Sequence, residues 1–130
     1  MRRTLQRFQA AGVPTIVIQD TPQLQATVLT CLARAGWIAR RQGACGAIRS
    51  RAVSLDVAHL ERRVVGAVRG SHVIDLTDTL CGADACTPIV GGQVAYQDGD
   101  HLTATMTRSL APMFMPTLDS AVAESNVPDP

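Results

Sequence analysis

The fold is decided by the stretch VPTIVI at residues 13–18, a nearly continuous run of β-branched residues. A run of this kind predicts a strand buried on both faces, as found in parallel sheets. The turn signal DTP at residues 20–22 ends the strand. On its other side, residues 2–11 predict a short helix that stops at Gly12.

A long helical pattern follows over residues 49–69, and Gly70 ends it. Apolar residues recur there at intervals of three to four, which predicts one apolar stripe along the helix. The stripe consists of Val53, Val57, Leu60, Val64 and Val68. Residues 72–76 predict a second short strand, so that strand, helix and strand form a βαβ unit with an expected right-handed crossover.

The other segments carry weaker signals. Residues 23–46 are loop-like with room for a short helix over 27–35, and residues 77–100 predict a long loop. A last helix is expected to begin at Thr103, a residue type that caps helix N-termini. Its predicted apolar stripe consists of Met106, Leu110, Phe114 and Leu118. Pro112 and Pro116 fall inside this pattern and predict a kink or an early stop.

The chain has 130 residues, the size of one domain. Two parallel strands buried on both faces need further sheet beside them. We therefore interpret residues 1–122 as part of a larger α/β fold, with a disordered tail over 123–130.

Composition excludes several classes of function. The net charge is +1, and all twelve basic residues are arginines that form no cluster in the sequence, so no nucleic-acid partner is expected. Aromatic residues make up 3% of the chain, which argues against a stacking platform for bases or sugars. The sequence shows no signal peptide and no stretch that approaches the roughly 18 apolar residues of a membrane span.

The four cysteines allow three pairings. Local bridges Cys31–Cys45 and Cys81–Cys86 are the favoured interpretation, because each pair lies in a loop that contains Gly and Ala. Four free thiols and a zinc site are the alternatives, although neither spacing matches the C-x2-C pattern typical of zinc. Disulfides imply an oxidising compartment, which conflicts with the missing export signal.

Asp98 and His101 stand three residues apart in a turn that leads into the last helix. This spacing lets the carboxylate reach the imidazole Nδ1, which fixes the tautomer and leaves Nε2 free as a general base toward a hydroxyl. Asp-x-x-His is common by chance, however. The alternative is a polar loop that caps the last helix, with its carboxylates near the positive end of the helix dipole.

Several motifs together resemble the C-terminal part of SGNH-type hydrolase domains. The similarity is narrower to those fused to multi-spanning membrane acyltransferases of actinobacterial envelopes, and it covers roughly residues 10–118. The motifs are VIQDTP at 17–22, CLA at 31–33 followed by Cys45, DLTDTLC at 75–81, CTP at 86–88, Gly91-Gly92, YQD at 96–98, HLT at 101–103 and LAP at 110–112.

The resemblance implies a three-layer α/β/α sandwich with parallel strands, of which this chain would be the back half. It implies that His101 is the catalytic base, that Asp98 orients it and that Asp100 is a bystander. In this family a Ser in a Gly-Asp-Ser block is the nucleophile, and a Gly and an Asn help to stabilise the oxyanion. No metal or organic cofactor is implied.

The sequence departs from this pattern at the nucleophile. There is no Gly-Asp-Ser block, and the only Asn is Asn126. Ser71 in Gly70-Ser71-His72 is rejected as the nucleophile, because in the family that serine follows the first strand. We therefore expect a chain that carries the base dyad, lacks the nucleophile and is inactive alone.

The resemblance also implies a setting and partners. The implied location is the outer face of the cell envelope. The implied partner is the missing N-terminal half or a membrane acyltransferase domain. The implied substrate is a glycan or glycolipid whose hydroxyl is acylated or deacylated. The alternatives are a non-catalytic, disulfide-stapled envelope module and a gene remnant.

Four expectations concern the remaining residues. His59 is expected to be a half-buried structural histidine, and Trp37 is expected to pack beneath the cysteine loop. His72 is expected to have no role, and the arginines are expected to be solvated.

Overall fold

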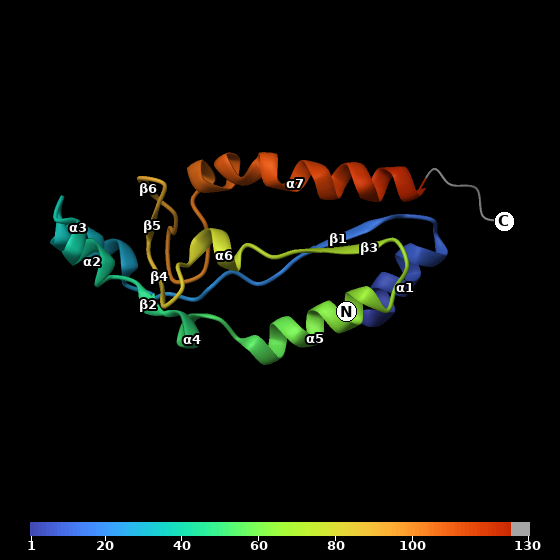
Figure 1. Ribbon diagram of the computed structural model, residues 1–130, viewed down its shortest axis with the longest axis horizontal. Coiled ribbons are helices and arrows are strands. Elements are labelled where there is room, and N and C mark those ends of the chain that lie inside the picture. The colour runs from blue at the N-terminus through green and yellow to red at the C-terminus, as the bar shows by residue number, and fades with distance from the viewer. Residues whose placement is uncertain (126–130) are drawn as a thin grey trace. The chain divides into compact units, whose positions relative to one another are not determined.

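The structure is a computed structural model that describes residues 1–125 (Figure 1). The chain forms two compact units. Unit 1 contains residues 1–19, 55–75 and the chain from 111 onward, and unit 2 contains residues 20–54 and 76–110. The elements are α1 (Arg2–Ala10), β1 (Thr15–Ile18), α2 (Val28–Ala35), α3 (Ala39–Gly43), β2 (Ala47–Ile48), α4 (Arg49–Ala52), α5 (Leu55–Gly66), β3 (Ser71–Ile74), α6 (Thr77–Leu80), β4 (Ala85–Cys86), β5 (Ile89–Val90), β6 (Gln93–Val94) and α7 (Ala104–Ser125).

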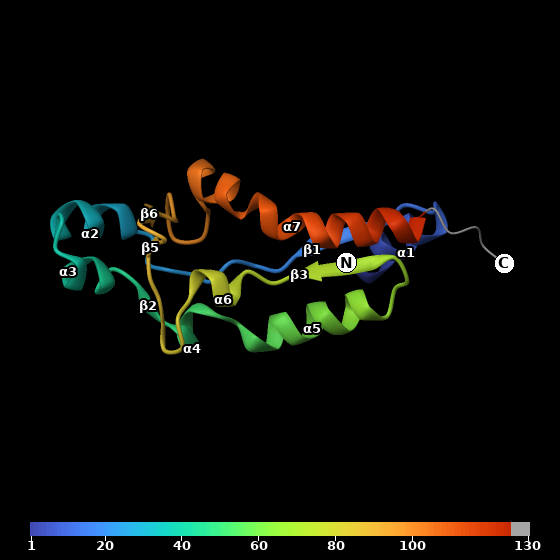
Figure 2. The same cartoon turned by 45° about the horizontal axis from the view of Figure 1, so that its top comes forward.

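Unit 1 is built on the predicted parallel pair β1–β3, in which Val17 is the register partner of Val73. Figures 1 and 2 show α5 and the later part of α7 on opposite sides of this pair. Leu5 of α1 packs with Val65 and Val68 in the core of the unit. The α/β class is therefore confirmed, whereas the described residues hold a parallel pair and not the wide sheet of a three-layer sandwich.

The strands of this pair are less buried than predicted. Residues 15–17 are half-buried, and Ile18 is 55% exposed. Among the described residues β1 and β3 have only each other as strand neighbours, so one edge of each strand is unpaired. The prediction of burial on both faces was wrong because it requires neighbouring strands and covering layers that these residues do not supply.

The helix predicted over 49–69 is two helices, because the backbone at Val53 is extended and separates α4 from α5. Its buried face agrees with the predicted stripe only in part, since Val68 is buried and Val64 packs against the core. Ala58 and Val65 are buried, whereas Val57 and Leu60 are exposed. The helix is rotated in this way because α1 and β3 pack against its Val65 side. His59 follows Ala58 on the exposed surface, so the expectation of a half-buried histidine was also wrong.

Helix α7 begins as predicted, since the Met106 N–H donates to the Thr103 hydroxyl oxygen at 3.1 Å. It does not stop at Pro112 or Pro116 but continues to Ser125. Residues 123–125 of the expected tail thus belong to the helix, and 126–130 lie outside the described residues. Of the predicted stripe, Met106 and Leu110 are buried. Within residues 1–125, no helix combines the length and hydrophobicity that crossing a bilayer requires.

Unit 2 is stapled by the two predicted disulfides, Cys31–Cys45 and Cys81–Cys86. The segment 77–100 is not one long loop, because it contains α6 and three two-residue strands. Strand β4 pairs antiparallel with β2, and β5 forms a hairpin with β6. Trp37 does not pack beneath the cysteine loop: buried Cys45 fills the interior there, and Trp37 is 98% exposed.

The arginines were expected to be solvated, but Arg62 and Arg49 form ion pairs. Arg62 of α5 contacts Asp75 at 2.7 Å and the Gln19 side-chain oxygen at 3.2 Å. Arg49 of α4 contacts Asp78 at 2.5 Å. His72, expected to have no role, lies 3.2 Å from the carboxylate of Glu124. These contacts hold neighbouring segments together within each unit.

Candidate active site

The loop between β6 and α7 carries Asp98 and His101, and its own backbone closes it. The Thr103 N–H donates to the Ala95 carbonyl at 2.9 Å, and the Gln97 N–H donates to the His101 carbonyl at 2.9 Å. Tyr96 and Leu102 form an antiparallel bridge between these two hydrogen bonds. The loop is therefore a narrow hairpin with Asp98 to Asp100 at its tip.

A second segment, residues 21–26, anchors that tip. The Leu24 N–H donates to the Gly99 carbonyl at 2.6 Å, and the Thr21 hydroxyl donates to the Asp100 carbonyl at 2.5 Å. The approach is close: a Cβ on Gly99 would lie 3.1 Å from the Leu24 carbonyl oxygen. The turn after the first predicted strand thus positions the Asp-x-x-His tip, a long-range contact that the sequence alone does not indicate.

Tyr96 lies fully buried at the base of the loop. Its hydroxyl has no hydrogen-bond partner among the described residues. Burial raises the pKa of Tyr96 to about 12. Tyr96 therefore supports the loop by packing and not through a polar contact.

The carboxylate of Asp98 is fixed by the backbone that follows it. Its Oδ1 accepts hydrogen bonds from the N–H of His101 at 2.8 Å and from the N–H of Asp100 at 3.1 Å. Asp side chains commonly close turns in this way. The hydrogen bond from the His101 N–H, and then that from the Asp100 N–H, lower the pKa of Asp98 to about 2. Asp98 is thus ionised across the physiological range.

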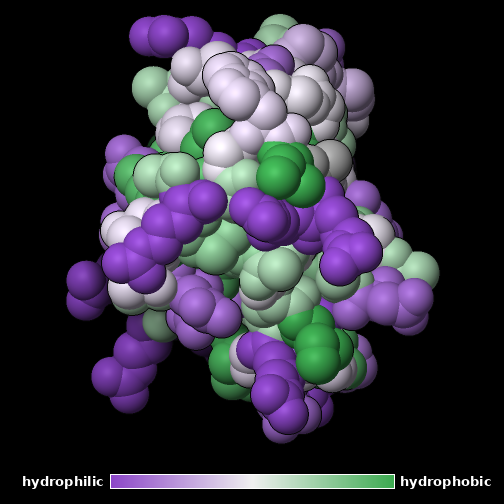
Figure 3. All heavy atoms as spheres, turned by 90° about the vertical axis from the view of Figure 1, so that its left-hand side faces the viewer, coloured by the Kyte–Doolittle hydropathy of each residue, from purple (hydrophilic) through white to green (hydrophobic). Residues whose placement is uncertain are grey.

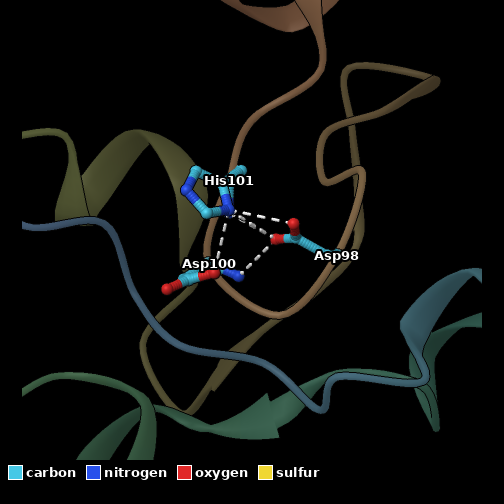
Figure 4. A group of neighbouring side chains, drawn as sticks. All are labelled: Asp98, Asp100 and His101. Carbon is cyan, nitrogen blue, oxygen red and sulfur yellow. Dashed lines mark hydrogen bonds and ion pairs between the residues drawn. The ribbon is translucent and has the colours of Figure 1, made fainter.

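The imidazole of His101 turns its Nδ1 toward this carboxylate. Nδ1 lies 2.9 Å from Asp98 Oδ2 and 3.1 Å from Asp98 Oδ1. An ionised carboxylate only accepts hydrogen bonds, so Nδ1 carries a proton and Nε2 is the free nitrogen of the neutral ring. Figure 4 shows Nε2 pointing away from the acidic residues. The contact between Asp98 and Nδ1 is the geometry that the three-residue spacing predicted.

Asp100 is closer to the histidine than the resemblance implies. Its Oδ1 lies 3.1 Å from Nδ1, so two carboxylates face one ring nitrogen (Figure 4). The hydrogen bond that His101 Nδ1 donates to Asp98, then the charge of Asp98 and that of Asp100, raise the pKa of His101. The spacing of Asp98 and Asp100, with Gly99 between them, could have indicated this contact from the sequence. In the tight tip of the loop both carboxylates face the same ring nitrogen.

The helix-capping alternative does not describe this loop. The Thr103 hydroxyl provides the side-chain cap of α7. The Asp98 carboxylate instead binds two N–H groups that precede the helix. The carboxylates are therefore not needed to cap the helix.

The three side chains are open to solvent, and the exposed fraction of the His101 side chain is 68%. Each offers one ligand atom within 4.8 Å of the others, a spacing that a cation would also accept. Exposed acidic groups often gather without an ion, however, and here the Nδ1 contacts account for the cluster.

A serine nucleophile is not found beside this histidine. No described serine hydroxyl forms a hydrogen bond with His101, and Ser71 belongs to β3 of unit 1.

Comparison with known families decides the identity of the chain. The family model described as the SGNH domain (fused to AT3 domains) matches residues 1–116. The chain belongs to this family. The match contains Asp98, His101 and all four cysteines, and it confirms the resemblance seen in the sequence. Neither the curated proteins nor the solved structures contain a significant match.

The SGNH domain is associated with hydrolase- and acyltransferase-type functions, and the fused AT3 domains are acyltransferases. Membership therefore supports this chemistry at the level of the family.

Proposed function

We propose that this SGNH domain supplies the base dyad of an esterase or O-acyltransferase, with His101 as general base and Asp98 as its orienting carboxylate. The observation that carries the proposal is the 2.9 Å contact between Asp98 Oδ2 and His101 Nδ1, in a loop whose backbone already holds the carboxylate. Nε2 is left free for proton transfer. A base held in this way is typical of serine-dependent acyl transfer.

The proposed step moves one proton and one acyl group. His101 Nε2 removes the proton of a serine hydroxyl as the serine oxygen attacks an acyl carbonyl carbon. The imidazolium then donates this proton to the leaving oxygen as the bond between acyl carbon and leaving oxygen breaks. Asp98 and Asp100 stabilise the transient imidazolium, because both carboxylates face Nδ1.

The nucleophile in this proposal comes from a Gly-Asp-Ser block outside these 130 residues, since the sequence contains none. The partner is the missing N-terminal half of the domain or the membrane acyltransferase domain itself. The acyl acceptor or donor is a hydroxyl of an envelope glycan or glycolipid at the outer face of the envelope. The isolated chain is therefore inactive.

Ester hydrolysis by two forms of the protein tests this. The isolated chain should cleave p-nitrophenyl acetate no faster than free imidazole does, because a base without its nucleophile loses most of the rate of the triad. A fusion of the chain to an N-terminal SGNH half that carries Gly-Asp-Ser should be active. His101→Ala should abolish that activity, and Asp98→Ala should reduce it strongly.

His59→Ala is the matched control, because it removes another exposed histidine, from α5 of unit 1. Activity of the fusion that survives His101→Ala would refute the base assignment. Turnover by the isolated chain that disappears with His101→Ala would show a nucleophile within these residues, with Ser71 the first to test. A correctly bridged fusion without any activity would favour the non-catalytic, disulfide-stapled envelope module.

A further inference from the structure

The turn between α2 and α3 presents the only tryptophan of the chain to solvent. Trp37 is 98% exposed, although tryptophan is normally well buried in folded proteins. Ile38, the next residue in this turn, is 49% exposed, and Leu29 near the start of α2 is 46% exposed. Exposed apolar groups gathered in one place mark interaction sites more often than isolated ones do.

This turn is held in place by specific contacts. Gly36 ends α2 with a positive φ of 58°, and the Gln42 side-chain amide donates to the Gly36 carbonyl at 2.6 Å. The Cys31–Cys45 disulfide ties α2 to the end of the α3 segment. Trp37 is therefore displayed by a braced turn, and docking it would require little ordering of the chain.

The surface around Trp37 is basic. Arg34, Arg40 and Arg41 are exposed, and none of them forms an ion pair with a described residue. Residues 21–55 contain five arginines and no Asp or Glu. Figure 3 looks onto the end that carries α2 and α3 and shows strongly hydrophilic side chains beside hydrophobic ones. Arg34, Arg40 and Arg41 all stand within four residues of Trp37 along the chain, so three of the twelve arginines flank this tip.

We propose that the α2–α3 tip is a docking surface for a bilayer that contains anionic lipids. Trp37 would enter the interfacial region, where tryptophan is enriched because one part of its ring system is apolar and its N–H is polar. Ile38 and Leu29 would add apolar contact. Arg34, Arg40 and Arg41 would bind lipid phosphates, and their stems would lie along the apolar surface.

The observations favour a lipid surface over a protein or a nucleic acid. The apolar groups stand on an exposed turn, whereas domains that recognise peptides hold them in a groove or along a sheet edge. One aromatic residue does not make the repeated stacking platform that binds single strands. The absence of acidic residues over 21–55 fits the negative potential of anionic headgroups. This inference is independent of the dyad, which lies in a different loop.

The single tryptophan makes the test direct. Fluorescence of the intact, disulfide-bonded chain reports Trp37 alone. Vesicles of phosphatidylcholine with phosphatidylglycerol should shift the emission to shorter wavelength, and brominated acyl chains should quench it. Pure phosphatidylcholine vesicles, soluble glycerol phosphate and a single-stranded oligonucleotide should do neither. Added salt should weaken the binding, because the attraction to the headgroups is screened.

The double variant Arg40→Gln/Arg41→Gln keeps the probe and should weaken vesicle binding about 20- to 30-fold, at about fivefold for each arginine. The matched control Arg2→Gln/Arg3→Gln removes the same charge from exposed positions on α1 and should leave binding nearly unchanged. Trp37→Ala should reduce co-sedimentation with the vesicles. Disulfide mapping and circular dichroism check that each variant is folded.

Three results would overturn the proposal. One is a folded chain whose emission ignores anionic vesicles at every lipid concentration. Another is an equal loss of binding in the two double arginine variants, which would indicate attraction by net charge alone. The third is a spectral shift with the oligonucleotide but not with vesicles, which would assign the tip to nucleic acid.

Discussion

At the scale of single residues, the environment of His101 sets how it titrates. Its pKa is raised, first by the hydrogen bond that it donates to Asp98 and then by the charges of Asp98 and Asp100. We predict that Asp98→Asn lowers the pKa of His101 strongly and that Asp100→Asn lowers it less. NMR titration of the imidazole proton signals of His101 measures both. An unchanged midpoint in Asp98→Asn would contradict the geometry.

The same contacts make the order of the loop depend on pH. The folded pKa of Asp98 is lowered to about 2, so its stabilisation is present above the unfolded pKa and is lost as the pH falls toward about 2. The folded pKa of His101 is raised, so its stabilisation is present below the unfolded pKa and is lost as the pH rises through the folded pKa. The loop should therefore be best ordered in mildly acidic solution.

Tyr96 offers a separate test of packing. Because its buried hydroxyl has no partner among the described residues, we predict that Tyr96→Phe leaves the free energy of unfolding unchanged or raises it by about 1 kcal/mol. Tyr96→Ala removes the buried ring and should cost about 3–5 kcal/mol. Urea unfolding measures both. A large loss in Tyr96→Phe would show that the hydroxyl has a partner.

At the scale of elements, the β2–β4 pair depends on a glycine beside it. A Cβ on Gly46 would lie only 2.2 Å from the Cys86 carbonyl oxygen, a backbone atom. We predict that Gly46→Ala separates the pair and lowers the free energy of unfolding by about 2 kcal/mol. Gly43→Ala is the control. Gly43 is the last residue of α3, and a Cβ there would meet no atom within 4 Å. It should be neutral or slightly stabilising.

Thermal or urea unfolding of these two variants decides the point. Equal stability of Gly46→Ala and Gly43→Ala would show that the strand pair tolerates a wider spacing than the structure has. The comparison is informative because both substitutions change the unfolded chain in the same way.

Helix α7 shows which features of a helix a local sequence pattern predicts reliably. The start of α7 was predicted at Thr103, because a hydroxyl cap needs only the N–H groups of the next turn. Its path past Pro112 and Pro116 was not predicted. Proline removes one N–H from the helical ladder, but packing of buried residues such as Leu110 and Ala121 outweighs this local cost.

At the scale of the whole molecule, unit 1 exposes strand edges and apolar side chains. Strands β1 and β3 each have one described neighbour, and Ile18, Val57 and Leu60 are exposed. We predict that the isolated chain self-associates as its concentration rises and that it unfolds with low cooperativity. Sedimentation velocity and thermal melting measure this.

Charge placed on the open strand should relieve the association. Ile18→Lys should shift the chain toward monomer, whereas Val94→Lys, at an exposed position on β6 of unit 2, should have little effect. A strictly monomeric wild-type chain with one sharp transition would contradict the interpretation of unit 1 as part of a larger sheet.

The sequence by itself determined the features that depend on short separations and on order along the chain. These are the βαβ succession with β1 parallel to β3, the two local disulfides, the cap at Thr103 and the three-residue spacing of Asp98 and His101. The family followed from the same motifs. Each rests on local backbone preference or on residues that a short loop brings together, so periodicity and spacing were sufficient.

Only the tertiary structure decided the features that depend on packing between distant segments. Contacts with α1 and β3 bury Val65, which lies outside the predicted stripe, while Val57 and Leu60 of the stripe stay exposed. Trp37 is on the surface although Cys45 nearby is buried. Residues 21–26 anchor the loop in which Asp100 approaches His101. A helix with several apolar positions can bury more than one face, and a loop can close in several ways. The choice among them is made by neighbours far away in the sequence, which a local pattern does not encode.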